Sequence, residues 1–247
     1  KAGARARTLV QQILSFSRRQ PTERKRTALA PIIEETARLL RATLPARLAL
    51  EIHCAADVPP VLADAAQIQQ VLLNLATNAM QAIRGRPGRI VIRLNTVTLD
   101  EALADAHPAL GAMHAKHPGS AVRIAVSDDG SGMDAATLVR IFEPFFTTKP
   151  VGEGTGLGLA VVHGIVQAHE GAIVVGSRPG KGTTFTLYLP AAEAQAVAPE
   201  SDQSAAATVP ALRLDGGRHI LYLDDDESLV FLVQRLLERR GYRLSGY

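Results

Sequence analysis

Three short motifs follow one another between Val126 and Leu159, and they constrain the fold and chemistry of this chain more than any other stretch. In the first, an alternating apolar run typical of a half-buried strand ends at Asp128, and a Gly-x-Gly turn follows. This order predicts that the Asp128 carboxylate stands at a strand end and faces a cleft. There it could accept a hydrogen bond from an amino group on a base.

The last of the three motifs is rich in glycine and leads into a segment with helical spacing. Glycine occupies the alternate positions 152, 154, 156 and 158, and the largely apolar residues 159–166 follow. Glycine lets backbone N–H groups approach a polyphosphate closely, and the positive end of the helix dipole favours the anion. Together with Asp128, the pattern predicts a bound purine triphosphate, with its base at Asp128 and its phosphates at the glycines.

Two better-known phosphate loops do not match these glycines. No Gly-Lys-Ser/Thr follows them, which excludes a P-loop, and their spacing differs from the Gly-x-Gly-x-x-Gly pattern of dinucleotide-binding folds. A flexible surface loop would explain the glycines alone. It would not explain why Asp128 and Asn78 precede them.

A long helix is expected from an N-cap at Asp64 to a stop at Gly85, and it carries Asn74 and Asn78 on one face. Asparagine is a mediocre helix former, so two of them one turn apart invite an explanation. Nearby backbone groups could satisfy both side chains. Alternatively, Asn78 offers its amide oxygen to Mg²⁺, a hard cation that prefers oxygen ligands.

Hydrophobic periodicity predicts the other elements of residues 21–190. A helix is expected over 30–43, and strands over 48–54, 90–97, 122–126, 173–175 and 183–189, with the last two joined by a turn over 179–182. Residues 98–120 contain several Pro and Gly and are expected to form an irregular connection. No cysteine or paired carboxylate completes a metal site with its histidines, His107, His114 and His117.

The two ends of the chain differ from the part between them. Residues 1–20 have the spacing of the last turns of a helix that packs on another helix, and residues 191–216, rich in Ala, Gln, Ser and Pro, are expected to be a flexible linker. A strand over 219–223, an acidic run and a helix over 229–240 follow. They predict the beginning of a second domain at residues 217–247, since so few residues cannot close one.

Lys and Arg are concentrated in residues 1–47, which carry eleven of them against three Glu, although the net charge is only +3. Because these side chains follow helical repeats without interleaved aromatics, a solvated helical face is favoured over a nucleic-acid surface. The single cysteine, Cys54, excludes an internal disulfide. No apolar run is long enough for a membrane span, so we expect a cytoplasmic location, and an anchor of the parent protein would have to precede residue 1.

Taken in order, the motifs resemble the catalytic ATP-binding domain of sensor histidine kinases, in the ATPase superfamily shared with gyrase, the Hsp90 chaperones and MutL. The matching motifs are Asn74/Asn78, Asp128-x-Gly130-x-Gly132, Phe142-Glu143-Pro144-Phe145 and Gly154-Thr155-Gly156-Leu157-Gly158-Leu159. The resemblance covers residues 27–190. It implies the α+β fold of the GHKL (Bergerat) ATPases, a two-layer sandwich with helices on one face of a mixed sheet, for a domain at 21–190.

The resemblance implies roles at the base and the metal. Asn78 would coordinate Mg²⁺, Asp128 would bind the adenine amino group of ATP, and Gly130 and Gly132 would shape the wall beside the base. Asn74 stands where hydrolytic relatives carry a glutamate base. Since an amide cannot usefully accept a proton, this substitution suits transfer to a nucleophile on another domain better than hydrolysis.

The resemblance also implies a mobile lid over the phosphates at residues 142–158. Its nucleotide-binding residues would be Gly154, Thr155, Gly156, Leu157 and Gly158. Within the lid, Lys149 would offset charge on the γ-phosphate during transfer, although an exposed, solvated lysine is the alternative. Thr183 and Thr184 resemble the family's last motif, at the floor of the pocket.

Outside the pocket, residues 9–20 resemble the end of the second dimerisation helix of such kinases. Residues 220–227 resemble the first strand and acidic pocket of a response-regulator receiver domain, in which Asp224 and Asp225 would help hold Mg²⁺. Together these features imply a hybrid histidine kinase, homodimeric in its parent form, with a receiver domain or response regulator as partner and no nucleic acid.

The implied activity is transfer of the ATP γ-phosphoryl group to a histidine on a dimerisation helix outside this chain. None of the seven histidines lies in a His-Glu/Asp context on such a helix, so the phosphoacceptor is expected upstream of residue 1 and the receiver's phosphorylated aspartate beyond residue 247. Two alternatives stay open. One is a nucleotide-sensing pseudokinase scaffold; the other is an ATP-driven clamp of the MutL or gyrase type, which would need the missing glutamate.

Overall fold

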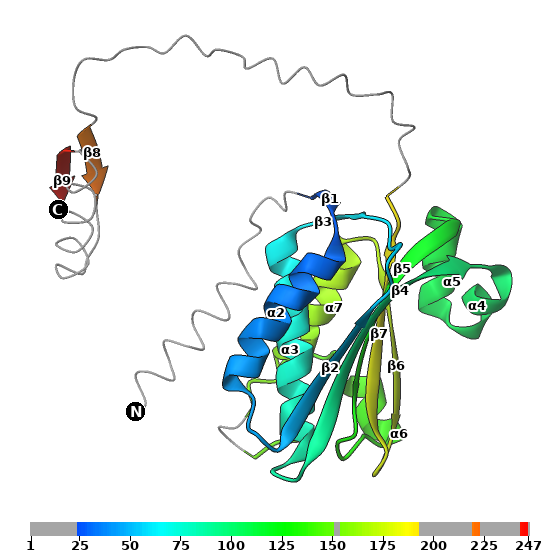
Figure 1. Cartoon of the computed structure of the whole chain (residues 1–247). Coiled ribbons are helices and arrows are strands. Elements are labelled where there is room, and N and C mark those ends of the chain that lie inside the picture. Colours follow the sequence, from blue (N-terminus) through cyan, green and yellow to red (C-terminus); the bar gives the residue numbers. More distant parts are fainter. Residues whose placement is uncertain (1–23, 151–153, 193–218, 223–242, 247) are drawn as a thin grey trace. The chain divides into compact units, whose positions relative to one another are not determined.

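The computed structural model describes residues 24–150, 154–192, 219–222 and 243–246 (Figure 1). The predicted helix end over 1–20, nearly all of the linker over 191–216, Asp224, Asp225 and the helix over 229–240 lie outside the described residues. The chain divides into two units, residues 1–193 and 194–247.

The first unit is built on a five-stranded mixed sheet of order β2-β4-β5-β7-β6. Its strands are β2 (Leu48–Cys54), β4 (Gly88–Leu99), β5 (Gly119–Asp128), β6 (Ala172–Arg178) and β7 (Gly182–Pro190). The pair β2 and β4 is parallel, and the other neighbours are antiparallel. The predicted strands are therefore confirmed, and all but β2 extend further than expected.

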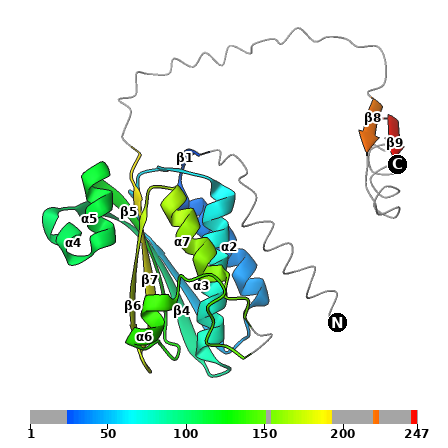
Figure 2. The same ribbon diagram turned by 180° about the vertical axis from the view of Figure 1, so that it is seen from behind.

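Three helices cover one face of this sheet, as both views show (Figures 1 and 2). They are α2 (Leu29–Thr43), α3 (Ala65–Ile83) and α7 (Gly158–Ala168). Because strand side chains alternate between faces, Ile92, Ile124 and Leu187 point to the same side and are buried with Leu72 of α3 in the main core. The predicted helix over 30–43 and the layer of helices on one face are thus confirmed.

The expectation of an irregular connection over residues 98–120 is wrong. This segment forms two short helices, α4 (Glu101–Ala106) and α5 (Pro108–Lys116), followed by the start of β5. Asp100 caps α4 by accepting a hydrogen bond from the backbone N–H of Leu103, at 2.8 Å. Pro108 opens α5 because proline suits the first turn of a helix.

The α4 and α5 pair lies against the second face of the sheet, near one end. Leu110 and Met113 of α5 are buried there in a small separate cluster with Leu99, Ala121 and Tyr188 of the strands. This contact supplies the burial that two short helices need, since helices of this length are marginal in isolation.

The helix that carries the two asparagines begins and ends close to where the sequence predicts. The Asp64 carboxylate accepts hydrogen bonds from the N–H groups of Ala66 and Gln67, at 2.9 and 3.3 Å. At the other end, Arg84 (φ 46°) takes the left-handed cap position, and Gly85 (φ 78°) follows it. The helix is thereby fixed over the whole of Ala65–Ile83.

Shorter elements complete the description. In the first unit, β1 (Lys25–Thr27) pairs with β3 (Val61–Ala63), and α6 (Ala135–Arg140) follows the glycine turn after β5. In the second unit, β8 (His219–Tyr222) pairs in parallel with β9 (Arg243–Gly246). The strand predicted from His219 is confirmed over these four residues.

A buried imidazole joins the end of α7 to the start of α3. His169 is 3% exposed; its Nδ1 lies 2.8 Å from the carbonyl oxygen of Ile165, and its Nε2 lies 3.1 Å from the backbone nitrogen of Asp64. A neutral ring with the proton on Nδ1 satisfies both contacts, because it donates to Ile165 and accepts from Asp64. Burial lowers the pKa of His169 below its ordinary value of 6.5.

We expect His169 to make the fold sensitive to acid. Because its pKa is lower in the folded state, its stabilising contribution is complete above about pH 6.5 and is lost as the pH falls through the folded pKa. Urea unfolding of wild type and His169→Gln should show the difference in unfolding free energy shrinking from near-neutral to mildly acidic pH. The exposed His53→Gln serves as the control. An equal wild-type advantage at both pH values would contradict this role.

Candidate functional site

Asp128 ends β5 in a half-buried position and is held by the backbone. Its Oδ1 accepts a hydrogen bond from the N–H of Gly130 at 2.7 Å, and the N–H of Thr183 also contacts the carboxylate. Burial raises the pKa of Asp128, and these two hydrogen bonds oppose that shift. A carboxylate has about four lone-pair sites, so it retains capacity to accept a hydrogen bond from a ligand amino group.

The glycine turn after Asp128 is pressed against the hairpin that joins β6 and β7. Gly132 has φ 64°, and a Cβ atom there would lie 1.9 Å from the carbonyl oxygen of Arg178. On either side, the Ser131 carbonyl accepts from Gly180 at 2.7 Å, and the Met133 N–H donates to the Ser177 hydroxyl at 2.9 Å. At Gly130 a Cβ atom would lie 2.5 Å from Asp128 Oδ1. Glycine is therefore required for this wall to form.

The two threonines predicted at the pocket floor point to opposite faces of β7. Thr183 pairs with Asp128 across the strands and is buried, with its hydroxyl 2.9 Å from that of Ser177. Thr184 pairs with Ser127, and its hydroxyl donates to that serine at 2.9 Å. The structure thus brings Thr183, and not Thr184, to the side of Asp128.

Asn74 and Asn78 face the start of α7. A Cβ atom at Gly158 would lie 3.9 Å from the amide oxygen of Asn74 and 4.0 Å from the amide nitrogen of Asn78. The residue before α7, Leu157, provides no side-chain cap for this helix. The first-turn N–H groups of α7 can therefore receive an anion beside the two amides.

The Phe142–Phe145 motif and the glycine-rich motif over residues 154–159 contact each other through their backbones. The N–H of Phe145 donates to the carbonyl of Gly156 at 3.0 Å. Both residues have positive φ, 68° and 67°, and a Cβ atom at Gly156 would lie 2.3 Å from the Phe145 carbonyl carbon. Thr155 Oγ1 accepts from the Leu157 N–H at 3.4 Å, and a Cβ atom at Gly154 would lie 2.8 Å from Thr147 Oγ1.

Lys149 reaches from this segment to α3. Its Nζ lies 3.3 Å from Asn78 Oδ1 and also contacts Gln81 Oε1. Burial lowers the pKa of Lys149. Gln81 is absent from the residues predicted from the sequence, although its position three residues after Asn78 on the same helix face was a usable signal.

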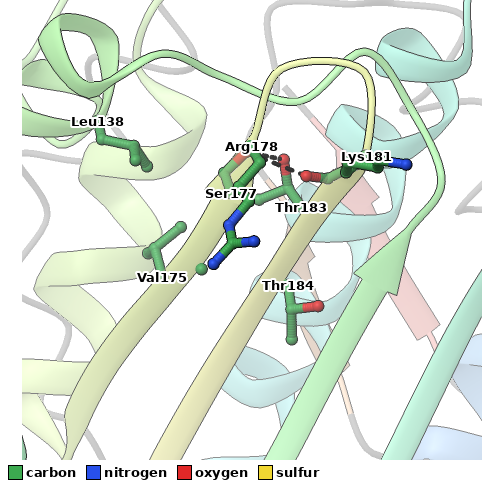
Figure 3. Close-up of a pocket in the computed structure, with 9 residues that line it drawn as sticks. Leu138, Val175, Ser177, Arg178, Lys181, Thr183 and Thr184 are labelled. Carbon is green, nitrogen blue, oxygen red and sulfur yellow. Dashed lines mark hydrogen bonds between the residues drawn. The ribbon is translucent and has the colours of Figure 1, made fainter.

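A hollow of about 400 Å³ lies at the β6 and β7 hairpin. Figure 3 shows side chains that line it. Ser177, Arg178, Lys181, Thr183 and Thr184 line it, with Leu138 of α6. Asn74, Asn78, Asp128 and Lys149 do not line this hollow, although Thr183, which pairs with Asp128, does.

Two classes of feature are absent from the part of the chain that the structure describes. It contains no group of three or more His, Cys, Asp or Glu side chains arranged to hold a metal ion. A metal bound at Asn78 would therefore depend on ligands from the bound phosphates and water. The same residues include no helix long and apolar enough to cross a bilayer.

Comparison with known proteins identifies related sequences. Residues 63–193 match the family described as "Histidine kinase-, DNA gyrase B-, and HSP90-like ATPase". The sensor kinase CckA of Brucella abortus (strain 2308) is 36% identical over 242 residues, which cover 96% of this chain and 25% of CckA. The sensor histidine kinase ZraS of Escherichia coli (strain K12) is 47% identical over 133 residues, 54% of this chain and 23% of ZraS. The chain thus spans about a quarter of the length of these relatives.

Solved structures agree with the fold. The catalytic domain of histidine kinase ThkA matches with a TM-score of 0.53 and 28% identity, covering 68% of this chain and 96% of that domain. Full-length ShkA in complex with AMPPNP matches with a TM-score of 0.62 and 23% identity, covering 100% of this chain and 46% of ShkA. The second likeness concerns the fold alone. Together they confirm the predicted two-layer α+β architecture.

Proposed function

This chain belongs to the family of histidine kinase-, DNA gyrase B- and HSP90-like ATPases, and we propose that it is the ATP-binding catalytic part of a hybrid sensor histidine kinase. In this proposal it transfers the γ-phosphoryl group of ATP to a histidine on a dimerisation helix outside the chain. The relatives named as sensor kinases, CckA and ZraS, support this assignment.

One observation carries the proposal: the amides of Asn74 and Asn78 lie beside the uncapped start of α7. This places oxygen ligands for a cation next to backbone N–H groups that favour an anion, which is the combination that metal-bound phosphates need. Asp128 stands at the end of β5, the strand adjacent to β4 and β7, and would accept from the adenine amino group.

The position of the Lys149 ammonium supports the fit of a divalent cation at Asn78. The Lys149 ammonium lies 3.3 Å from Asn78 Oδ1, so this oxygen is accessible and oriented toward positive charge. Asn78 would hold Mg²⁺, which neutralises charge on the phosphates when bound. Lys149 has three N–H donors and no acceptor, and could direct one donor to the γ-phosphate.

In the proposed reaction, an imidazole nitrogen attacks the γ-phosphorus, a P–N bond forms, the bond to the β–γ bridging oxygen breaks, and ADP leaves. The imidazole N–H proton is lost to solvent. Asn74 supports transfer over hydrolysis, because its amide cannot activate water as a general base. The chain's contribution is placement of ATP and stabilisation of charge.

The other assignments belong to the same proposal. The domains would be a dimerisation-helix end at 1–20, the catalytic domain at 21–190, a linker at 191–216 and the start of a receiver at 217–247, with Asp224 and Asp225 as its Mg²⁺ ligands. The parallel β8 and β9 pair suits a receiver of α/β type. A structure of histidine kinase ThkA in complex with response regulator TrrA, 25% identical to this chain with a TM-score of 0.56, supports a response regulator as partner.

The decisive experiment supplies this chain with ATP labelled in the γ-phosphate and a separate dimerisation domain from a hybrid kinase. We expect label on the acceptor domain that is stable to base and labile to acid, as phosphohistidine is, and none on this chain. ATP binding without transfer to a competent acceptor would favour the pseudokinase scaffold. Rapid release of free phosphate would favour an ATP-driven clamp.

Replacing Asn78 with alanine should abolish the contribution of Mg²⁺ to nucleotide binding. Because the Asn78 amide oxygen is the ligand that this proposal assigns to the Mg²⁺ bound with ATP, we expect at least about a 10-fold loss of affinity with Mg²⁺ present, equivalent to about 1.4 kcal/mol. Calorimetric titration with a non-hydrolysable ATP analogue, with and without Mg²⁺, measures this. Asn95→Ala, on the second face of the sheet, is the control. An Asn78→Ala variant that still gains affinity from Mg²⁺ would refute the assignment.

A further inference from the structure

We propose that Gln81 is a positioning residue of this site: together with Asn78 it holds the Lys149 ammonium, which occupies the cation position at Asn78 until a divalent metal displaces it. This inference rests on the proposed function, because it concerns the same Asn78 oxygen. It assigns a role to Gln81, and it implies that the Lys149 ammonium and the metal ion compete for the Asn78 amide oxygen.

The contacts of the Lys149 ammonium are two amide oxygens of one helix. Nζ lies 3.3 Å from Asn78 Oδ1 and also contacts Gln81 Oε1. Residues three apart on a helix are neighbours on its surface, so both amides of α3 can reach one ammonium group. The backbone of Lys149 is positioned separately, since its N–H donates to Thr147 Oγ1 at 3.2 Å.

Within the described residues, no Asp or Glu side chain forms an ion pair with the Lys149 ammonium. The oxygens that the structure places at this half-buried charge are neutral amide oxygens, the kind of ligand that Mg²⁺ also takes from Asn and Gln. A lysine ammonium is a compact point charge, so it and a metal ion compete for the same lone pairs.

Gln81 determines how strongly the lysine competes. With Asn78 alone, the ammonium would have one contact at the long end of hydrogen-bond range. The second oxygen, on Gln81, fixes the side chain beside the metal ligand. Removing that oxygen keeps Asn78 and the lysine charge intact and should therefore ease metal entry without altering the metal ligand itself.

Calorimetric titration of the full chain with an ATP analogue at increasing Mg²⁺ tests the competition. We expect Gln81→Leu to lower the Mg²⁺ concentration at half-maximal binding by about three- to ten-fold, the effect of one modest hydrogen bond. Gln70→Leu, an exposed glutamine on the same helix, should leave it unchanged. An unchanged or higher Mg²⁺ requirement in Gln81→Leu would overturn the inference.

A nucleotide-free measurement separates this inference from the proposed function. In NMR spectra of the ligand-free chain, Lys149→Met should shift the side-chain amide resonances of Asn78 and Gln81, and leave those of Gln70 in place. Unshifted Asn78 and Gln81 resonances would overturn the inference even if ATP binds normally. Failure of wild type to bind ATP, with these resonances shifted, would instead remove the proposed function and the metal competition with it.

Discussion

Asp128→Asn is expected to weaken ATP binding by about 10- to 150-fold while making the ligand-free domain more stable. A hydrogen bond to a charged group contributes about 1.5–3 kcal/mol, and each 1.4 kcal/mol is a tenfold change in affinity. The asparagine can still accept from the Gly130 N–H, as Oδ1 does now at 2.7 Å. Its amide nitrogen, however, is a donor and would meet the donor group of adenine.

The gain in stability follows from the direction of the pKa shift. Burial raises the pKa of Asp128 in the folded state above its ordinary value of 3.8. Stability associated with this group is therefore fully present below that value and is lost as the pH rises through the folded pKa. At neutral pH the ionised carboxylate destabilises the fold, and a neutral amide removes that penalty.

Both parts of this expectation can be measured on the same samples. Calorimetry with an ATP analogue gives the affinity, and thermal unfolding without nucleotide gives the stability. Asp129→Asn is the control for ATP affinity, because Asp129 Oδ1 accepts from the backbone N–H of Arg89 at 3.0 Å, a bond the amide retains. Its charge also raises the pKa of Asp128, so a smaller gain in stability is expected for this variant too. Undiminished ATP affinity in Asp128→Asn would remove this carboxylate from the base site.

Local pattern predicted most of the sheet and its main helix layer. The strand over 48–54 was predicted to the residue because its apolar side chains alternate and breakers flank it. The segment 98–120 was mispredicted because Pro108 and Gly111 look like helix breakers in isolation. Its helices depend on burial of Leu110 and Met113 against strands that are distant in the sequence, and periodicity within the segment does not reveal that surface.

For the site as well, features that depend on local sequence can be predicted, and features that depend on tertiary contacts cannot. The sequence predicts Asp128, Asn78 and the glycines because their chemistry follows from residue type and spacing. It does not separate Thr183 from Thr184, since the face each occupies depends on the register with Asp128 and Ser127. The sequence does not predict Gln81 for a related reason. Its role depends on a contact with Lys149, which is distant in the sequence.

Gly132→Ala should destabilise the domain by about 3 kcal/mol or more, whereas Gly180→Ala should cost about 1–2 kcal/mol. Both glycines have left-handed φ, 64° and 73°, so an alanine pays the same backbone penalty at each. They differ in space: a Cβ atom at Gly132 would lie 1.9 Å from the Arg178 carbonyl oxygen, and one at Gly180 would meet nothing within 4 Å. Comparing the two variants therefore isolates the clash from the conformational strain.

The clash at Gly132 should also reach the base site. Relief requires the turn at residues 130–133 to move away from the β6 and β7 hairpin, and Gly130 in this turn donates to Asp128 at 2.7 Å. We expect urea unfolding to show the larger loss for Gly132→Ala, and calorimetry to show weaker ATP binding for Gly132→Ala than for Gly180→Ala. Equal unfolding free energies for the two variants would mean that the turn at residues 130–133 can move without cost. The close packing of this turn on the hairpin would then have no part in holding the Asp128 carboxylate.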